Sequence, residues 1–305
     1  MTEIKGLIYG TYPKSDELRI KIGRWERGAL KGAEIEREIS AEKKLKTDLF
    51  ISTGSDYTDP LFNWYDIFRP FTCATEGISP GPLTRYKETN TFYRLPEVDH
   101  VGRMKINPSE FNEIEENPPL PMFQRNSDPK YFAFFPSPFS FFKMSKIKED
   151  VTLEKFTAGM ISIYSDIMKS YGFKNTLLFE SLPYQGEDIS LLSPLIEKFK
   201  TILVTEGNLK FVDFTPIGKK LYSIAATSED RNLEIASKHS IVPGIRIIDS
   251  HNTKIEDPKT VKETVNEEAE KAGVDSIYVT FNDYLDFLPF SIAAKKLEMI
   301  KGVIN

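Results

Sequence analysis

The sequence predicts an α/β protein, a single (β/α)8 barrel of the TIM type in which eight parallel strands alternate with helices. Three observations support this fold class. Short apolar runs recur along the chain, segments with helical periodicity separate most of them, and polar side chains follow the runs. Strands that are buried on both faces of a parallel sheet appear as continuous apolar runs, and a repeated strand–helix order predicts such a sheet. We therefore predict one domain over residues 1–305.

The first elements are predicted from local patterns. Residues 6–9 form the first predicted strand, and Ser15 is the predicted N-cap of the helix after it, because acidic side chains occupy its first turn. A charged helix is predicted at about 32–45 and the second strand at 48–52, followed by a helix that carries Trp64 and ends at Pro70.

The rest of the chain alternates more regularly. Each predicted strand is a short run of Val, Ile, Leu, Phe or Tyr, and the predicted helix at 153–171 places its apolar side chains at helical spacing. The predicted strands are 131–135, 176–180, 201–204, 221–225, 244–249 and 276–280, and the predicted helices are 153–171, 189–199, 230–238, 258–272 and 290–299.

A long segment at about 71–128 separates the second strand from the third. Within it, a turn at 80–82 is followed by alternating basic, aromatic and amide residues through Arg94. Alternation with period two predicts a β-ribbon insertion after strand two, with Arg85 and Lys87 on one face. Such a ribbon is either an exposed hairpin with a solvated charged face or a basic ribbon that binds an anionic small molecule. The second interpretation is possible because the planar guanidinium group of arginine matches the geometry of a carboxylate.

Composition excludes several classes of function. The 40 basic and 45 acidic residues give a net charge of −5, which offers no electrostatic case for nucleic acid or an anionic membrane. No apolar run approaches the roughly 20 residues of a spanning helix, and the first residues lack a signal-peptide pattern, so we expect a cytoplasmic protein.

The one cysteine, Cys73, rules out an internal disulfide and a multi-cysteine metal site. The Lys/Glu-rich composition is typical of a thermophile.

Candidate site residues lie where predicted strands end. In barrels of this kind the loops after the strands form the active face, and the polar residues found there are Ser52, Ser140, Glu180, Thr205, Asp249 and Asp283. Glu180 is a catalytic candidate or the partner of a loop arginine. The three histidines share no close spacing, which argues against a zinc site on one element. His251 is a site residue or polar filler, and Trp64 belongs to the core or to an aromatic wall for a ring ligand.

Several motifs together resemble one family. They are Gly10-Thr11-Tyr12-Pro13, the Trp-x-Asp-x-Phe-Arg-Pro pattern at 64–70, the segment 81–94, Pro136–Ser140, Val242-Pro243-Gly244 and Asp249-Ser250. These segments are similar to motifs of the cobalamin-independent methionine synthase family, including its archaeal single-barrel members. The resemblance implies a barrel that takes part in moving a methyl group from a methylated folate to homocysteine.

The zinc ligands that the family implies are missing. Catalytic members bind zinc through His-x-Cys after strand five, Glu at strand six and Cys after strand eight. In this sequence no His or Cys lies between Thr201 and Thr215, and residues 226–228 stand where the family has Glu. Asn282-Asp283 replaces the last Cys, and Asp249 replaces the family histidine after strand seven. The resemblance therefore predicts no zinc in this chain.

Full-length bacterial members carry two barrels, and their zinc-free amino-terminal barrel helps to hold the folate tail. The resemblance thus implies a subunit of a split methionine synthase that binds a methylated tetrahydropterin and works with a separately encoded zinc-bearing barrel. It predicts three groups of residues: Arg19, Arg85, Lys87 and Arg94 for the anionic tail; Trp64, Asn90 and Ser140 near the ligand; and Glu180, Asp249 and Asp283 at the barrel mouth as catalytic candidates. The chain is not expected to be active alone.

Two alternatives remain open from the sequence. The chain could be a stand-alone methyltransferase of this superfamily that uses a different acceptor or a corrinoid donor, with the mouth carboxylates acting without zinc. It could also be a non-enzymatic regulatory or scaffolding partner. Methyl transfer by the isolated chain separates the first alternative from the split enzyme, and pterin binding separates the second.

Overall fold

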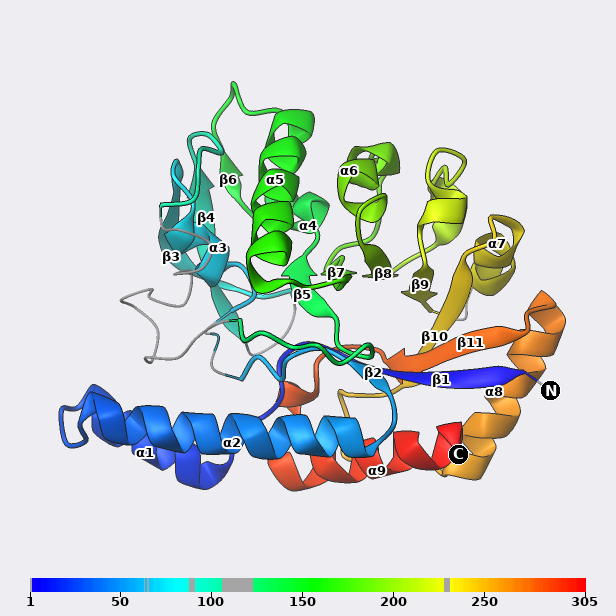
Figure 1. Cartoon of the computed structure of the whole chain (residues 1–305), viewed down its shortest axis with the longest axis horizontal. Helices are drawn as coiled ribbons and strands as arrows, with labels where there is room; N and C mark the ends of the chain where they lie inside the picture. The colour runs from blue at the N-terminus through cyan, green and yellow to red at the C-terminus, as the bar shows by residue number, and fades with distance from the viewer. Residues whose placement is uncertain (1, 63, 65, 88–90, 106–122, 228–230) are drawn as a thin grey trace.

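Eight parallel strands form one curled sheet in the order β2-β1-β11-β10-β9-β8-β7-β5 (Figure 1). The computed structural model describes residues 2–62, 64, 66–87, 91–105, 123–227 and 231–305. The strands of the curled sheet are β1 (Glu3–Ile8), β2 (Asp56–Tyr57), β5 (Ala133–Pro136), β7 (Asn175–Phe179), β8 (Lys200–Val204), β9 (Ser223–Ala226), β10 (Val242–Ile248) and β11 (Ser276–Phe281).

The two edges of this sheet meet. Tyr57 in β2 donates its backbone N–H to the carbonyl of Lys130 at 2.9 Å, and Phe132 donates to the carbonyl of Tyr57 at 2.8 Å. A parallel bridge between Tyr57 and Tyr131 accompanies these bonds. Because Tyr131 lies two residues before β5, the bridge joins the first and last strands in the order and gives the sheet a barrel-like shape.

Helices lie outside the curled sheet. In Figure 1, α1, α2 and α9 run along one side of it, and α5 and α6 lie on the opposite side. Ser15 caps α1 as predicted, since its hydroxyl accepts the N–H of Leu18 at 3.1 Å. The helices are α1 (Asp16–Glu26), α2 (Gly32–Ser52), α3 (Arg69–Ala74), α4 (Pro138–Lys143), α5 (Leu153–Tyr171), α6 (Ser193–Ile196), α7 (Asn232–Lys238), α8 (Pro258–Ala272) and α9 (Phe290–Ile304).

A second sheet has three strands, of which β3 (Ile78–Arg85) and β4 (Phe92–Val98) lie between β2 and β5 in the sequence and β6 (Lys146–Ile147) follows β5. β3 pairs antiparallel with β4, and β6 pairs parallel with β4. Arg85 lies opposite Phe92, and Thr84 lies opposite Tyr93. This pairing fixes which side chains of β3 and β4 share a face.

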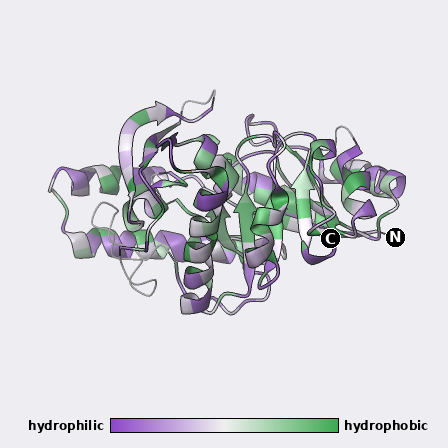
Figure 2. Cartoon of the chain, turned by 90° about the horizontal axis from the view of Figure 1, so that it is seen from above, coloured by the Kyte–Doolittle hydropathy of each residue, from purple (hydrophilic) through white to green (hydrophobic). Residues whose placement is uncertain are grey.

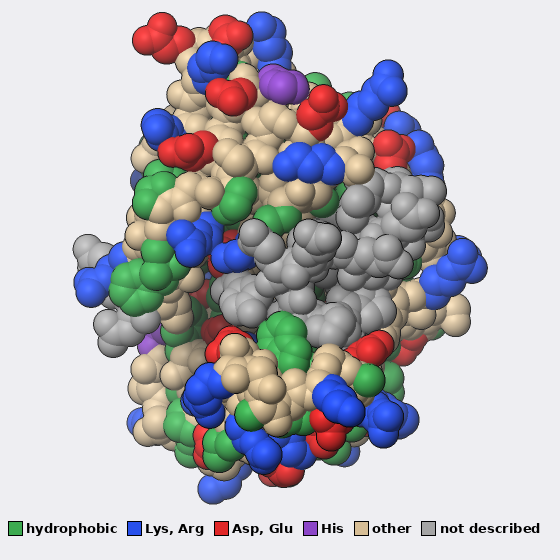
Figure 3. Space-filling view, turned by 90° about the vertical axis from the view of Figure 1, so that its left-hand side faces the viewer, with side chains coloured by type: hydrophobic (Ala, Val, Ile, Leu, Met, Phe, Trp, Pro, Cys, Tyr) green, Lys and Arg blue, Asp and Glu red, His purple; other side chains and the backbone are tan. Residues whose placement is uncertain are grey.

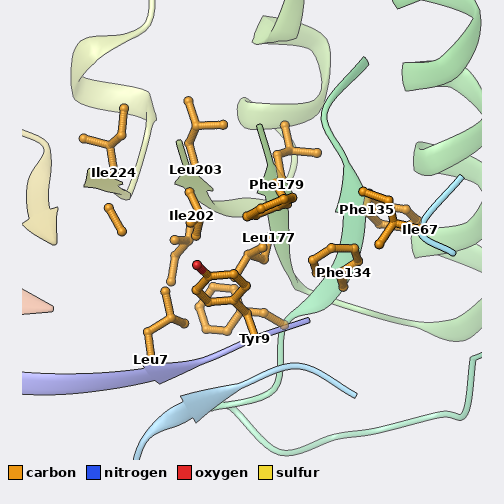
Figure 4. Packing of buried hydrophobic residues seen from close by; sticks show 14 of the residues in the cluster. Leu7, Tyr9, Ile67, Phe134, Phe135, Leu177, Phe179, Ile202, Leu203 and Ile224 are labelled. Carbon is orange, nitrogen blue, oxygen red and sulfur yellow. The ribbon is translucent and has the colours of Figure 1, made fainter. Parts of the chain in front are cut away.

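Apolar side chains of the parallel strands make up the core. Apolar residues concentrate on the central strands (Figure 2), and side chains from β5, β7 and β8 converge with Tyr9 on one cluster (Figure 4). The ring of Phe179 lies 5.6 Å from that of Tyr9 and 4.8 Å from that of Tyr284. Burying a side chain of this size stabilises a fold by about 1.5–3 kcal/mol.

The predicted second strand at 48–52 is wrong, because these residues are the last turns of α2. Along α2 the buried positions Ile35, Ile39, Lys43, Lys46 and Phe50 follow helical spacing, while Ile51 is 47% exposed. A short apolar run does not distinguish a strand from a buried helical turn. The actual second strand is Asp56–Tyr57, and Ser52 lies at an exposed helix end.

The predicted helix end at Pro70 is also wrong, since Pro70 lies in the first turn of α3. Proline lacks a backbone N–H, and the first turn of a helix is where that loss costs least. Asp66 stabilises this start, because its Oδ1 accepts the N–H groups of Phe68 at 2.8 Å and Arg69 at 2.7 Å. Among the described residues, no helix is long and apolar enough to cross a membrane.

Candidate functional site

The carboxyl ends of the parallel strands gather charged side chains at one end of the barrel, the mouth. Glu206 follows β8, and Asp283 follows β11. Arg246 lies on β10, and His251 follows that strand. Lys87, which follows β3, completes a group that we call the mouth charge cluster.

Ion pairs connect the mouth charge cluster. Lys87 Nζ lies 2.7 Å from Glu206 Oε1 and 3.9 Å from Asp283 Oδ2. Arg246 Nη2 lies 3.5 Å from Glu206 Oε1, and His251 Nε2 lies 3.5 Å from Asp283 Oδ2. Each acidic side chain therefore faces two cationic groups, counting the imidazole when it is protonated.

The segment after β3 brings Lys87 to the mouth. The buried hydroxyl of Tyr86 donates to Ser181 Oγ at 3.0 Å, which ties the segment to the loop after β7. Lys87 has a positive φ of 52°, so the alternation of faces stops there. Lys87 consequently turns to the mouth, while Arg85 stays exposed opposite Phe92, and the predicted shared face of Arg85 and Lys87 is wrong.

Opposing effects set the ionisation of the acid–histidine pair. Burial alone would raise the pKa of Asp283, but the hydrogen bond with His251 and the charges of Lys87 and Arg246 outweigh it and hold the pKa below its ordinary value. The hydrogen bond with Asp283 in turn raises the pKa of His251. Asp283 is thus an anion at neutral pH.

Glu180 lies at the end of β7 and is fully buried. The Ser140 hydroxyl donates to Glu180 Oε1, and Ser140 Oγ accepts the N–H groups of Ser181 at 2.7 Å and Leu182 at 3.1 Å. Glu180 Oε2 has no hydrogen-bond partner among the described residues. Burial raises the pKa of Glu180 to about 7, so this carboxyl changes charge near neutral pH.

A cavity of about 120 Å³, which we call the aromatic pocket, lies between the β3–β4 sheet and the loops after β1 and β11. It is lined by Thr11, Lys14, Trp64, Asp66, Ile67, Tyr86, Thr91, Phe92, Tyr93, Tyr284, Asp286 and Phe287. His251 flanks it, since its ring packs against that of Phe287 with centroids 5.4 Å apart.

Three buried polar atoms of residues that line the aromatic pocket lack a hydrogen-bond partner in the described part of the chain: Tyr284 Oη, Trp64 Nε1 and Asp286 Oδ1. Trp64 Nε1 is a donor, and Asp286 Oδ1 is an acceptor. Burial raises the pKa of Asp286 to about 6 and lowers the pKa of Lys14. An unsatisfied buried group costs about 1–3 kcal/mol, so a ligand that matched Trp64 Nε1 and Asp286 Oδ1 would recover this free energy.

The remaining predicted residues lie apart from these groups. Arg19 is exposed on α1, and its charge adds to burial in lowering the pKa of Lys14. Arg85 and Arg94 are exposed on β3 and β4, and Asn90 lies outside the described residues. Charged residues of both signs are interspersed on the face of Figure 3, without one large basic patch among the described residues. These arginines therefore do not converge with Lys87 through any contact that we observe.

Asp249 lies at the edge of the mouth in a local hydrogen-bond network. Its Oδ1 accepts the N–H of His251 at 2.8 Å and the side-chain amide of Asn282 at 3.1 Å. Burial opposes the ionisation of Asp249, but these bonds prevail and lower its pKa. Asp249 thus orients the loop that carries His251.

The sequence alone does not single out four residues of these groups, which are Glu206, Arg246, Lys14 and Asp286. Glu206 directly follows Thr205, which was singled out, and Asp286 follows Asp283 by three residues. A search of several residues beyond each strand end would have included both acids, whereas their pairing with Lys87 or Trp64 depends on long-range folding.

The residues at the mouth do not fit the zinc ion that the resemblance implies for catalytic barrels. In the described part of the chain, no group of three or more His, Cys, Asp or Glu side chains is arranged to hold a metal ion. Glu206 and Asp283, which follow strands five and eight, face the ammonium group of Lys87. A second cation between them would be repelled by that charge.

Comparison with solved structures places the fold among methionine synthase-like proteins. No family model matches the sequence, and no curated protein matches it. A B12-independent methionine synthase from Shewanella sp. W3-18-1, solved in complex with selenomethionine, superposes with a TM-score of 0.64 at 14% identity over 90% of this chain and 89% of that chain.

Two further solved structures give the same result. A putative vitamin-B12 independent methionine synthase from Listeria monocytogenes has a TM-score of 0.59 at 12% identity, over 97% of this chain and 94% of that chain. A methyltransferase from Methanosarcina mazei has a TM-score of 0.51 at 12% identity, over 97% of this chain and 93% of that chain. At these identities the likeness shows a shared fold.

Proposed function

We propose that this chain is the subunit that binds a methylated tetrahydropterin in a split cobalamin-independent methionine synthase. A separately encoded barrel would supply zinc and bind homocysteine, and this chain would orient the methyl donor toward it. In this proposal the chain is a single (β/α)8 barrel with a ribbon insertion at about 71–128. The shared fold with proteins described as methionine synthases supports the reaction class, and oriented binding supplies much of the rate of such a transfer.

The aromatic pocket is the observation that carries the proposal. A pterin is a flat heterocycle whose edge presents adjacent N–H donors and a carbonyl acceptor. Trp64 Nε1 offers a donor for that carbonyl, and Asp286 Oδ1 offers an acceptor for the N–H groups. Tyr86, Tyr93 and Phe287 supply aromatic surface around the ring. Pocket shape, apolar walls and a few convergent polar atoms are typical of small-molecule sites.

The donor's anionic tail would meet exposed arginines. Arg19, Arg85 and Arg94 are exposed cations on α1, β3 and β4. Lys14, two residues before α1, and Phe92, the first residue of β4, line the pocket. Arginine binds carboxylates through a planar fork. Lys87 is engaged with Glu206 at the mouth, so in this structure it is not available to the tail.

Calorimetric titration with a methylated tetrahydropterin tests the pocket. Trp64→Phe keeps an aromatic ring but removes the indole N–H, and Asp286→Asn removes the carboxylate. We expect each to weaken binding by about 1–2 kcal/mol, or about 5–30-fold. Asp213→Asn, at an exposed acid, is the matched control and should leave binding unchanged. If both pocket variants bound the pterin with unaltered affinity, the pterin would not bind in the aromatic pocket.

One observation favours the stand-alone methyltransferase as a second candidate. The mouth of this single chain already holds Glu180, whose pKa of about 7 suits proton transfer at neutral pH. A fold shared with a methyltransferase from Methanosarcina mazei is consistent with this alternative. Methyl transfer by the purified chain without a second barrel would favour it over the split enzyme.

A further inference from the structure

The barrel contributes two acids to the mouth, and a different part of the chain supplies the cation between them. Glu206 and Asp283 come from loops after β8 and β11, whereas Lys87 comes from the end of β3. Lys87 Nζ lies 2.7 Å from the first carboxylate and 3.9 Å from the second. The ammonium group therefore occupies a position that two carboxylates define.

Barrel residues hold both carboxylates independently of Lys87. Asp283 has a side chain that is 4% exposed and accepts the backbone N–H of Tyr284 at 2.8 Å, with His251 at 3.5 Å on its other side. Arg246, with a side chain that is 1% exposed, lies 3.5 Å from Glu206 and donates to the carbonyl of Thr205 at 2.7 Å. The two acids are thus preorganised by their own barrel.

Lys87 itself is held less firmly. Its side chain is 17% exposed, and that of Glu206 is 29% exposed, so water reaches their ion pair. Its positive φ of 52° is a conformation that costs a residue with a Cβ about 1–2 kcal/mol. Release of this backbone strain would offset part of the free energy that is lost when the ion pair breaks.

We propose that Glu206 and Asp283 form a binding subsite for a primary ammonium group, that Lys87 fills this subsite as an in-chain stand-in, and that a ligand carrying such a group enters by displacing Lys87. Two carboxylates facing one point select a cation rather than an anion. A primary ammonium group is compact and carries three N–H donors, which match the carboxylate oxygens of Glu206 and Asp283. The proposal concerns the mouth and does not depend on pterin binding in the aromatic pocket.

Chemical rescue tests the subsite. Lys87→Ala leaves the two carboxylates without their ammonium group, and ethylamine hydrochloride is the probe, with potassium chloride at equal ionic strength as the reference. We expect ethylamine to raise the melting temperature of Lys87→Ala in a saturable way. Wild type should require a higher concentration, because Lys87 competes. Lys87→Met, which keeps the aliphatic stem, is the second variant if Lys87→Ala does not fold.

Two variants make the test specific. Lys87→Ala combined with Glu206→Gln should bind ethylamine about ten-fold more weakly than Lys87→Ala, because one charge-assisted bond is lost. Lys146→Ala removes another lysine–glutamate pair of the β3–β4–β6 sheet, with Glu97 at 3.0 Å, and should show no rescue. Equal rescue of wild type and Lys87→Ala, an effect of potassium equal to that of ethylamine, or no saturable rescue in a folded Lys87 variant would each overturn the proposal.

Discussion

Replacement of Glu180 by glutamine should make the protein more stable at neutral pH and less sensitive to pH. Burial raises the pKa of this carboxyl from its ordinary value of 4.5 to about 7 in the folded protein. A carboxyl whose pKa is raised by folding stabilises the fold while it is protonated, and that contribution is lost as pH rises from about 4.5 to about 7. The difference of about 2.5 in pKa corresponds to about 3 kcal/mol. Glutamine has no charge to bury and can still accept from Ser140.

Urea unfolding between pH 4.5 and pH 8 measures this effect. For wild type we expect the free energy of unfolding to carry a component, about 3 kcal/mol, that falls across this range, and for Glu180→Gln we expect that component to be absent. Glu149→Gln, at an exposed glutamate, is the control and should follow wild type. Parallel pH curves for wild type and Glu180→Gln would refute the reasoning, because they would mean that Glu180 titrates alike in the folded and unfolded chains.

Three further predictions concern other residues. Asp286→Asn should remove a loss of stability between pH 4 and pH 6, since burial raises the pKa of Asp286 from 3.8 to about 6; an unchanged pH dependence of urea unfolding would contradict this. Asp66→Ala should lower the free energy of unfolding by about 1–3 kcal/mol, because Asp66 accepts three backbone N–H groups; urea unfolding measures it, and a change below about 0.5 kcal/mol is the contrary result. Phe179→Ala should cost about 3–5 kcal/mol, while Phe179→Leu costs less; equal melting temperatures for the two would show that the core does not depend on this ring.

Most of the parallel sheet could be predicted from the sequence because its strands are buried. The predicted strand at 201–204 lies within β8, and the predicted helix at 258–272 coincides with α8. In both cases a local pattern and the tertiary environment agree. A buried strand needs continuous apolar residues, and α8 begins with an Asp257 N-cap followed by Pro258.

The second strand could not be found in the same way. β2 has two residues, Asp56 and Tyr57, and its place in the sheet depends on contacts with β1 and on the bridge to Tyr131. The nearby apolar run at 48–52 is a stronger local signal for a strand, but it belongs to α2 and contributes Phe50 to the buried face of that helix. Length and periodicity do not separate these cases when a run is so short.

The candidate site was only partly predictable for a related reason. Ser140 and Glu180 were both singled out by their positions after strands, and the fold brings them into contact. Lys87 meets Glu206 across 119 residues, and its direction depends on a positive φ that a sequence does not reveal. The unsatisfied atoms of the aromatic pocket are likewise products of tertiary packing.

The most direct test of the central claim is metal analysis with a methyl-transfer assay of the purified chain, alone and mixed with a zinc-bearing barrel from the same genome. A methylated tetrahydropterin is the donor, and homocysteine is the acceptor. The account predicts transfer only in the mixture, with no zinc bound to this chain. Stoichiometric zinc in this chain, together with turnover by the chain alone, would contradict it.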